Sequence, residues 1–208
     1  MTLSYRGFPV LTQVPHRIET DEPVARRETS IASVAGRFRV VSDTAFPSVS
    51  HPFPWFCATR AEIAAVDAFL ASVAGRYGRT WVPTWLEDLV FVADAVDPLV
   101  GWGGLTVQIG RYAELLFPAE PRRHLVGIAP DGTVSGPWRL YRTIDNPDAT
   151  TTLIPEGGLG PIAAPLDTVL WGWLTLCRLD TDDVTRRYYA PDVCDLVLTF
   201  TEVPLEIA

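Results

Sequence analysis

The sequence contains no lysine: its 17 basic residues are all arginine, they face 25 acidic residues, and the net charge is -8. Duplex nucleic acid repels such a surface, and no basic stripe along the chain compensates for it. Specific nucleic-acid binding is therefore not expected. Arginine forms planar, bidentate pairs well, so the composition is compatible with a protein interface.

Cysteine is scarce. Cys57, Cys177 and Cys194 are far apart, and none has the spacing of a zinc motif or a disulfide framework. A reducing compartment is the simpler interpretation. Cys177 and Cys194 lie in predicted strands that could be neighbours, where buried free thiols are the leading interpretation and a disulfide or a cluster shared with a partner is the alternative. No cofactor is expected.

Long apolar runs are also absent. No uncharged apolar stretch reaches 18 residues, and the N-terminus lacks the basic start and apolar run of a secretory signal. We therefore expect neither a membrane span nor secretion. Apolar residues still make up 48% of the chain and charged residues 20%, which predicts a packed core in one large domain or in a domain with an insertion.

No group of side chains indicates a thiol enzyme or a metal site. His51 and Cys57 are close in sequence, but they flank an extended Pro-Phe-Pro-Trp segment without the signature of a nucleophile and its base. His16 and His124 are isolated, without metal-ligand spacing. We expect Cys57 to be an ordinary buried cysteine.

Acidic and glycine-rich segments likewise lack the spacing of a known site. The Asp-rich segment 180–183 begins like a calcium loop, but the chain lacks the later Gly and Glu of an EF-hand. Glu87 and Asp88 are adjacent, hence on opposite faces if extended, which is unsuitable for a glycosidase pair. Residues 157–160 are glycine-rich, but proline and not a helix follows them, so a phosphate cradle is not expected. The sequence therefore predicts no catalytic residues.

Residues 59–74 predict an α-helix. Thr59 can cap its N-terminus, and Glu62 three residues later completes a capping box. Gly75 follows the last predicted helical residue, where a glycine in the left-handed conformation commonly caps the C-terminus of a helix. A stripe of apolar residues at helical spacing predicts that this helix packs on a sheet. The stripe consists of Ile63, Val66, Phe69, Leu70 and Val73.

Most of the remaining sequence has the pattern of strands and turns. Residues 1–58 read as extended, and the last strand alternates with one wholly apolar face. We expect a mainly β (α+β) protein in which 1–100 and 166–208 form the core domain and 101–165 a β-rich insertion. Strands are predicted at 36–42, 89–93, 105–109, 112–117, 124–129, 133–142, 168–179, 184–189 and 193–200, and loops at 146–152 and 156–161.

Two segments carry a recognisable order of motifs. The first contains Thr59-Arg60-Ala61-Glu62-Ile63, Phe69-Leu70, Gly75-Arg76, Trp81-Val82-Pro83-Thr84-Trp85 and Asp88-Leu89. The second contains Cys177-Arg178-Leu179-Asp180, Tyr188-Tyr189, Val193 to Phe200 and Glu202-Val203-Pro204. Together they cover roughly a third of the chain, and they resemble the distal tail and minor tail (tail-tip) proteins of long-tailed, siphovirus-like bacteriophages.

The resemblance implies a structural virion protein and not an enzyme. The implied fold is a tail-tube-like β-sandwich or barrel with a packed helix. The implied function is a homo-oligomeric ring, three- or six-fold, that links the tail tube to the distal tip or hub of the baseplate. Its partners would be further copies of itself, the tail tube protein, and the tail hub and tape-measure proteins. It would be made in the host bacterial cytoplasm and reside in the virion tail tip, where an acidic lumen would not hold DNA.

Arginine and tryptophan side chains are the candidate interface residues. The arginines could pair with acidic residues of a neighbouring subunit or be solvated, and the tryptophans could anchor a core or an interface. The alternative function is a small phage-borne carbohydrate-binding module or hydrolase, with Trp81 and Trp85 stacked on a sugar. The candidates are Arg60, Arg76, Arg79, Trp81, Trp85, Trp171 and Trp173.

Overall fold

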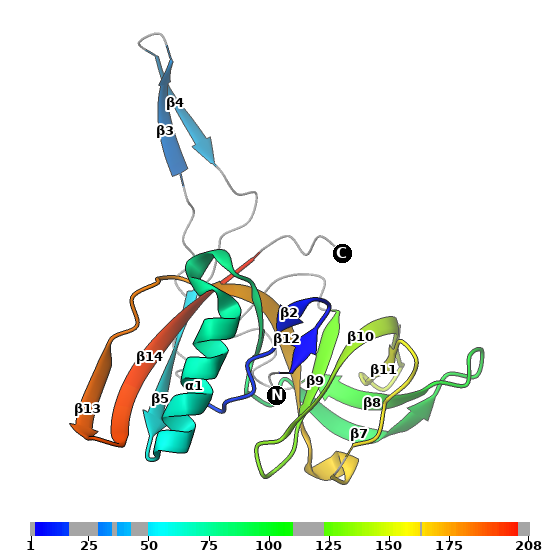
Figure 1. Ribbon diagram of the computed structural model, residues 1–208. Coiled ribbons are helices and arrows are strands. Elements are labelled where there is room, and N and C mark those ends of the chain that lie inside the picture. The colour runs from blue at the N-terminus through cyan, green and yellow to red at the C-terminus, as the bar shows by residue number, and fades with distance from the viewer. Residues whose placement is uncertain are drawn as a thin grey trace.

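The computed structural model describes residues 3–16, 29–34, 37–42, 50–109, 123–162 and 164–203. It shows a mainly β chain with one α-helix in the described part, which confirms the predicted fold class. Figure 1 shows two bodies side by side: a closed barrel and a sheet with the helix on one face. No helix in the described ranges is long and apolar enough to cross a membrane.

Six antiparallel strands close the barrel. The order is β12-β7-β8-β11-β10-β9, and β9 pairs again with β12. Side chains alternate between the interior and the solvent, so a compact apolar cluster around Trp171 fills the centre. The strands are β7 (Leu89–Val96), β8 (Gly103–Ile109), β9 (His124–Ile128), β10 (Val134–Asp145), β11 (Thr151–Pro155) and β12 (Leu170–Leu179).

A second sheet extends from the same strand. The end of β12 pairs with the end of β14 (Val193–Glu202), and β14 also pairs with β5 (Ser50–Cys57) and β13 (Arg186–Ala190). The helix α1 (Arg60–Val73) packs on one face of this sheet. β12 is therefore buried on both faces over most of its length, which explains its long apolar run.

Short elements join the two bodies. β6 (Thr80–Pro83) pairs with β12, and a hairpin of β1 (Ser4–Tyr5) and β2 (Phe8–Pro9) leads to a parallel bridge between Val10 and Trp81. A single 3-10 turn, η1 (Gly75–Tyr77), follows α1, and another, η2 (Leu166–Thr168), precedes β12. β3 (Thr29–Val34) and β4 (Arg37–Ser42) form a hairpin that pairs with no other described strand and lies apart from the rest in Figure 1.

The helix forms as predicted. Thr59 caps it, since its side chain accepts a bond from the Glu62 backbone N–H at 3.2 Å, while the Glu62 carboxylate accepts one from the Ala58 N–H at 2.7 Å. The left-handed residues at its end are Ala74 and Gly75, which places the cap one residue earlier than expected. The predicted stripe packs into the core of the helix-backed sheet.

The sequence did not predict every strand: β1, β2, β3, β5 and β6 lie in segments for which no strand was predicted, and β11 begins inside an expected loop. For β5 the sequence predicted only an extended segment, because Pro52 and Pro54 argue against a central strand. Both prolines sit where the missing N–H would point away from β14, since the Pro54 carbonyl bonds outward to the His16 N–H. β11 begins at Thr151, inside the expected loop 146–152. The predicted strand 112–117 lies outside the described residues.

The predicted boundaries of the insertion fall within the barrel region. Four strands of the barrel, β8 to β11, come from residues 101–165, whereas β7 and β12 come from the segments on either side. The barrel therefore closes with strands from both sides of those boundaries. The division into a core domain and an insertion stays a prediction.

Candidate functional site

The tryptophans of the Trp-Val-Pro-Thr-Trp strap are buried within the chain. Trp81 is 2% exposed and donates its indole N–H to the Tyr5 carbonyl at 3.0 Å; Trp85 is buried as well. Trp171 lies in the barrel core and donates to the Leu166 carbonyl at 3.0 Å. The chain itself covers the rings of these three residues, and their role in an interface or on a sugar stays a prediction.

The other candidates are more accessible. Arg60 begins α1 and is exposed, as is Arg76, whose guanidinium lies 5.9 Å from the Tyr77 ring centroid. Arg79 is half-buried, 5.9 Å from the Phe8 ring centroid. Trp173 is partly buried beside the barrel core. Their role in an interface stays a prediction.

Asp88 organises the strap from inside. Its carboxylate is fully buried and accepts bonds from the Thr84 hydroxyl and from the Trp173 N–H, the latter at 2.9 Å. A buried carboxylate is stable only when such donors replace its hydration. The neighbouring Glu87 is exposed, as expected for adjacent residues of an extended segment. Asp88 therefore holds the strap against β12, which is a structural role.

Exposed apolar side chains gather on the face of the β5–β14–β13 sheet that α1 leaves uncovered. Phe56, Tyr189 and Val197 are each about half exposed. The Phe56 and Tyr189 ring centroids are 6.5 Å apart, and the Tyr189 hydroxyl donates to Asp195 at 2.8 Å, which raises the pKa of Tyr189. Arg187 lies over the Tyr189 ring at 5.4 Å. We call Phe56, Tyr189 and Val197 the β14 face.

A second group of exposed apolar side chains lies on the β7–β8 hairpin. Val92 and Val96 belong to β7, and Leu99, which is 79% exposed, lies at the tip. We call these three residues the β7–β8 surface. Figure 1 places β13 and β14 at the left end of the molecule and the β7–β8 tip at the right end. Sequence reasoning missed both groups because alternation shows which residues share a face, but not which face another element covers.

A basic hollow of about 460 Å³ lies beside the barrel. Arg139 and Arg142 flank a bulge of β10, Arg123 precedes β9, and Glu156 follows β11. Backbone bonds from Leu140 N–H to the Arg123 carbonyl (2.7 Å) and from Glu156 N–H to the Arg139 carbonyl (2.8 Å) hold these segments together. Sequence analysis could not detect this site, because its residues meet only when the barrel closes.

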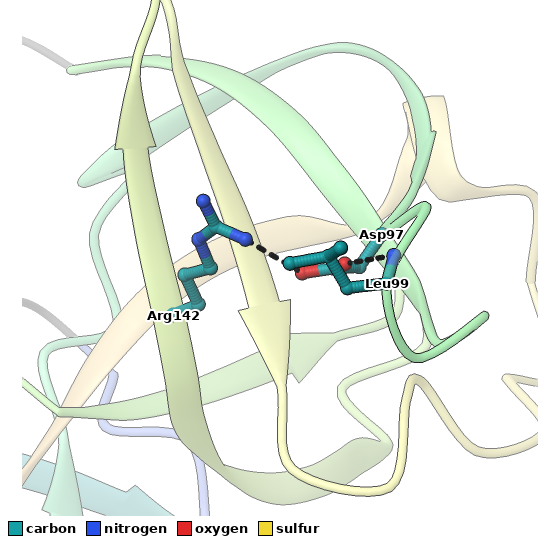
Figure 2. Close-up of polar contacts among 3 residues, drawn as sticks. All are labelled: Asp97, Leu99 and Arg142. Atoms are coloured by element: carbon teal, nitrogen blue, oxygen red, sulfur yellow. Dashed lines mark hydrogen bonds and ion pairs between the residues drawn. The ribbon is translucent and has the colours of Figure 1, made fainter.

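Arg142 is the anchored arginine of this hollow. Figure 2 shows its guanidinium directed at Asp97, with Nη1 3.5 Å from Oδ2, while the other carboxylate oxygen accepts the Leu99 N–H at 2.8 Å. The Asp97 side chain is fully buried, and a buried carboxylate needs a positive partner. The charges of Asp97 and Arg142 therefore compensate each other. Within the described residues, Arg123 and Arg139 have no acidic group within 4.0 Å. Counting only the described residues that line the hollow, Glu156 offsets one of these two charges and one positive charge is left.

The three cysteines are free and buried. Cys177 lies opposite Glu202 and not opposite Cys194, whose register partner is Cys57. Burial raises the pKa of Cys177 well above its ordinary value, and the nearby Glu202 adds to this effect. His51 lies six residues before Cys57 on the same face of β5, roughly 20 Å away along the strand, so it cannot act as its base.

Cys57 also lines a hollow of about 300 Å³ together with His16 and Glu62. This grouping does not form an activated nucleophile. Burial, the Cys194 thiol and the charge of Glu62 raise the pKa of Cys57 to about 11, whereas a catalytic thiol needs a lowered pKa. Among the described residues, no group of three or more His, Cys, Asp or Glu side chains is arranged to hold a metal ion.

Comparison with known proteins adds no family. No protein-family model matches the chain, and no curated protein is significantly similar to it in sequence.

Proposed function

We propose that this chain is a structural protein of a phage tail tip that assembles into a homo-oligomeric ring between the tail tube and the distal hub. The observation that carries the proposal is the pair of exposed apolar surfaces at opposite ends of the molecule. A head-to-tail ring needs two different surfaces on each subunit, related by a rotation that closes. The β14 face and the β7–β8 surface are suited to that arrangement.

The composition of the β14 face supports a protein contact. Interface centres are enriched in aromatic residues within a polar rim, and here Phe56 and Tyr189 are bordered by Arg187 and Asp195. Strand addition at the neighbouring edge is unfavourable, because Pro52 and Pro54 offer no N–H there. The contact would therefore use the face of the sheet and not its edge.

The β3–β4 hairpin supports assembly independently. A two-stranded hairpin is marginally stable alone in water, and this one pairs with no other described strand of its own chain. In the proposed ring it would pack on a neighbouring subunit. The tail tube, hub and tape-measure proteins remain the partners that the resemblance implies, and the acidic chain suits a passage for DNA.

Two variants with one blocked surface each test the head-to-tail arrangement. F56D/V197D disables the β14 face, and V92D/L99D disables the β7–β8 surface, so each should be monomeric by light scattering after gel filtration. Mixed together, they should form a discrete dimer, because one working surface of each kind remains. Tyr77 is 89% exposed and lies outside both surfaces, so Y77D should assemble like the unmodified chain. Unchanged assembly of both double variants, or a mixture that stays monomeric, would contradict this proposal.

The basic hollow favours a second candidate, the binding of an acidic glycan. One net positive charge suits a monoanionic carboxylate, which arginine binds through paired N–H groups. Tyr141, Thr143 and Glu156 supply hydroxyl and carboxylate partners for sugar hydroxyls. The volume of about 460 Å³ lies within the usual range of small-molecule sites.

Calorimetric titration with galacturonate and with uncharged galactose tests this candidate. Galacturonate alone should bind, and R139A should abolish binding. R178A, which removes an exposed arginine of β12 that does not line the hollow, should leave binding unchanged. Equal binding of both sugars, or none of galacturonate, would eliminate the glycan candidate.

A further inference from the structure

Cys57 and Cys194 face each other across two neighbouring antiparallel strands. Cys57 is the last residue of β5, and Cys194 is its register partner near the start of β14. Their side chains are 2% and 0% exposed, on the buried side of the sheet. Burial and the neighbouring Cys194 thiol both raise the pKa of Cys57. Two thiols far apart in the sequence thus lie side by side.

The backbone at this pair suits a disulfide. Opposed residues of an antiparallel ladder have Cα atoms about 4.5–5.5 Å apart, within the roughly 4.4–6.8 Å that disulfides span. The Pro54 carbonyl points away from β14, so the backbone groups of Cys57, three residues later, point toward β14. Cys57 and Cys194 therefore form a hydrogen-bonded pair, the kind with the larger Cα–Cα distance. The Cβ atoms, about 5.5 Å apart in such a pair, must then approach by about 1–2 Å. This is the terminal pair of the ladder, where such an adjustment disturbs few other bonds.

A small reagent has a route to this pair. Cys57 lines the hollow of about 300 Å³ that Gln13, His16 and Glu62 border on its other sides. The hollow lies between the segment after β2 and the first turns of α1. Cys177 lines neither of the two hollows described above, and its register partner is Glu202.

We propose that Cys57 and Cys194 are a latent disulfide that closes when the protein meets a small disulfide oxidant such as glutathione disulfide. The Cys57 thiolate attacks one sulfur of the oxidant, forms a mixed disulfide and releases one glutathione. The Cys194 thiolate then attacks the Cys57 sulfur and releases the second glutathione. The two thiol protons pass to the departing glutathione thiolates, so one disulfide is reduced as one is formed.

The bond would fasten the edge strand β5, and with it the start of α1, to β14. The raised pKa of Cys57 keeps its thiolate scarce near neutral pH, so closure is slow there and faster in alkaline solution. Strain in the wide pair makes the bond readily reducible. The inference does not depend on ring formation, since the whole pair belongs to one chain.

Oxidation of the full chain, followed by mass spectrometry, tests the proposal. The unmodified protein is incubated with glutathione disulfide, remaining thiols are alkylated in denaturant, and peptides are mapped without reduction. We expect the loss of two hydrogens, a Cys57–Cys194 linked peptide and one alkylated thiol at Cys177. C177S should oxidise in the same way, whereas C57S and C194S should form no intramolecular bond.

The measurement on the unmodified protein needs no variant to fold. Three alkylated thiols after prolonged incubation at pH 9, or linked peptides that contain Cys177, would overturn the proposal. So would a product in which Cys57 retains glutathione without forming the internal bond. Dithiothreitol should restore all three thiols, and the oxidised protein should have a higher melting temperature than the reduced one.

Discussion

The single residue expected to affect stability most is Asp88, whose buried carboxylate holds the Trp-Val-Pro-Thr-Trp strap against β12. Replacing it by alanine leaves the Thr84 hydroxyl and the Trp173 N–H without their acceptor. We expect D88A to lower the free energy of unfolding by about 2–4 kcal/mol, since buried donors lose a charged partner. Urea denaturation measures this loss.

The adjacent exposed residue provides the control. E87A should change the free energy of unfolding by less than about 0.5 kcal/mol, as surface substitutions generally do. Equal effects of D88A and E87A would show that the strap is not held by this carboxylate.

The raised pKa of Cys57 predicts a stability that depends on alkaline pH. The pKa of Cys57 is about 11 in the folded chain, whereas its ordinary value is 9.0. The folded chain therefore favours the protonated thiol over the thiolate. That contribution is complete below pH 9 and is lost as the pH rises through 11. The free energy of unfolding should therefore fall over this interval under reducing conditions, and C57S should show a smaller fall. An identical decline in C57S would mean that Cys57 is not responsible.

Among the elements, α1 was predictable because its signals are local. Thr59, Glu62 and the apolar stripe lie within 16 residues, and each agrees with the others. T59A should cost about 1 kcal/mol of stability through loss of the cap, as thermal denaturation can show. S72A removes a side-chain bond to the Phe69 carbonyl in the last turn and serves as the matched control, with a smaller expected effect. A cost for T59A no larger than for S72A would contradict the assigned cap.

β5 was not predictable because its stability depends on distant residues. The prolines argue against a strand until the position of β14 shows that their missing donors face away from it. The sequence of β12 correctly predicted a strand, but it did not show where that strand lies. An apolar run on both faces fits the centre of a sheet and an interface. Pairing with both the barrel and the second sheet resolves that ambiguity in favour of the centre.

At the scale of the whole molecule, the mainly β fold could be predicted from the sequence. The residues that meet when the barrel closes could not, because they are far apart in the chain and share no local pattern. Arg123, Arg139 and Glu156 became neighbours in this way. The interface role of the arginine candidates stays a prediction, and Trp81, Trp85 and Trp171 are buried within the chain. The two exposed apolar surfaces at opposite ends are the feature that gives the assembly proposal its geometry.

The most direct test of the ring is negative-stain electron microscopy of the purified chain at high concentration. The proposal predicts closed rings of uniform size with a central hole and three- or six-fold symmetry, absent from F56D/V197D. Particles of monomer size alone at every concentration, indistinguishable from those of that variant, would contradict it.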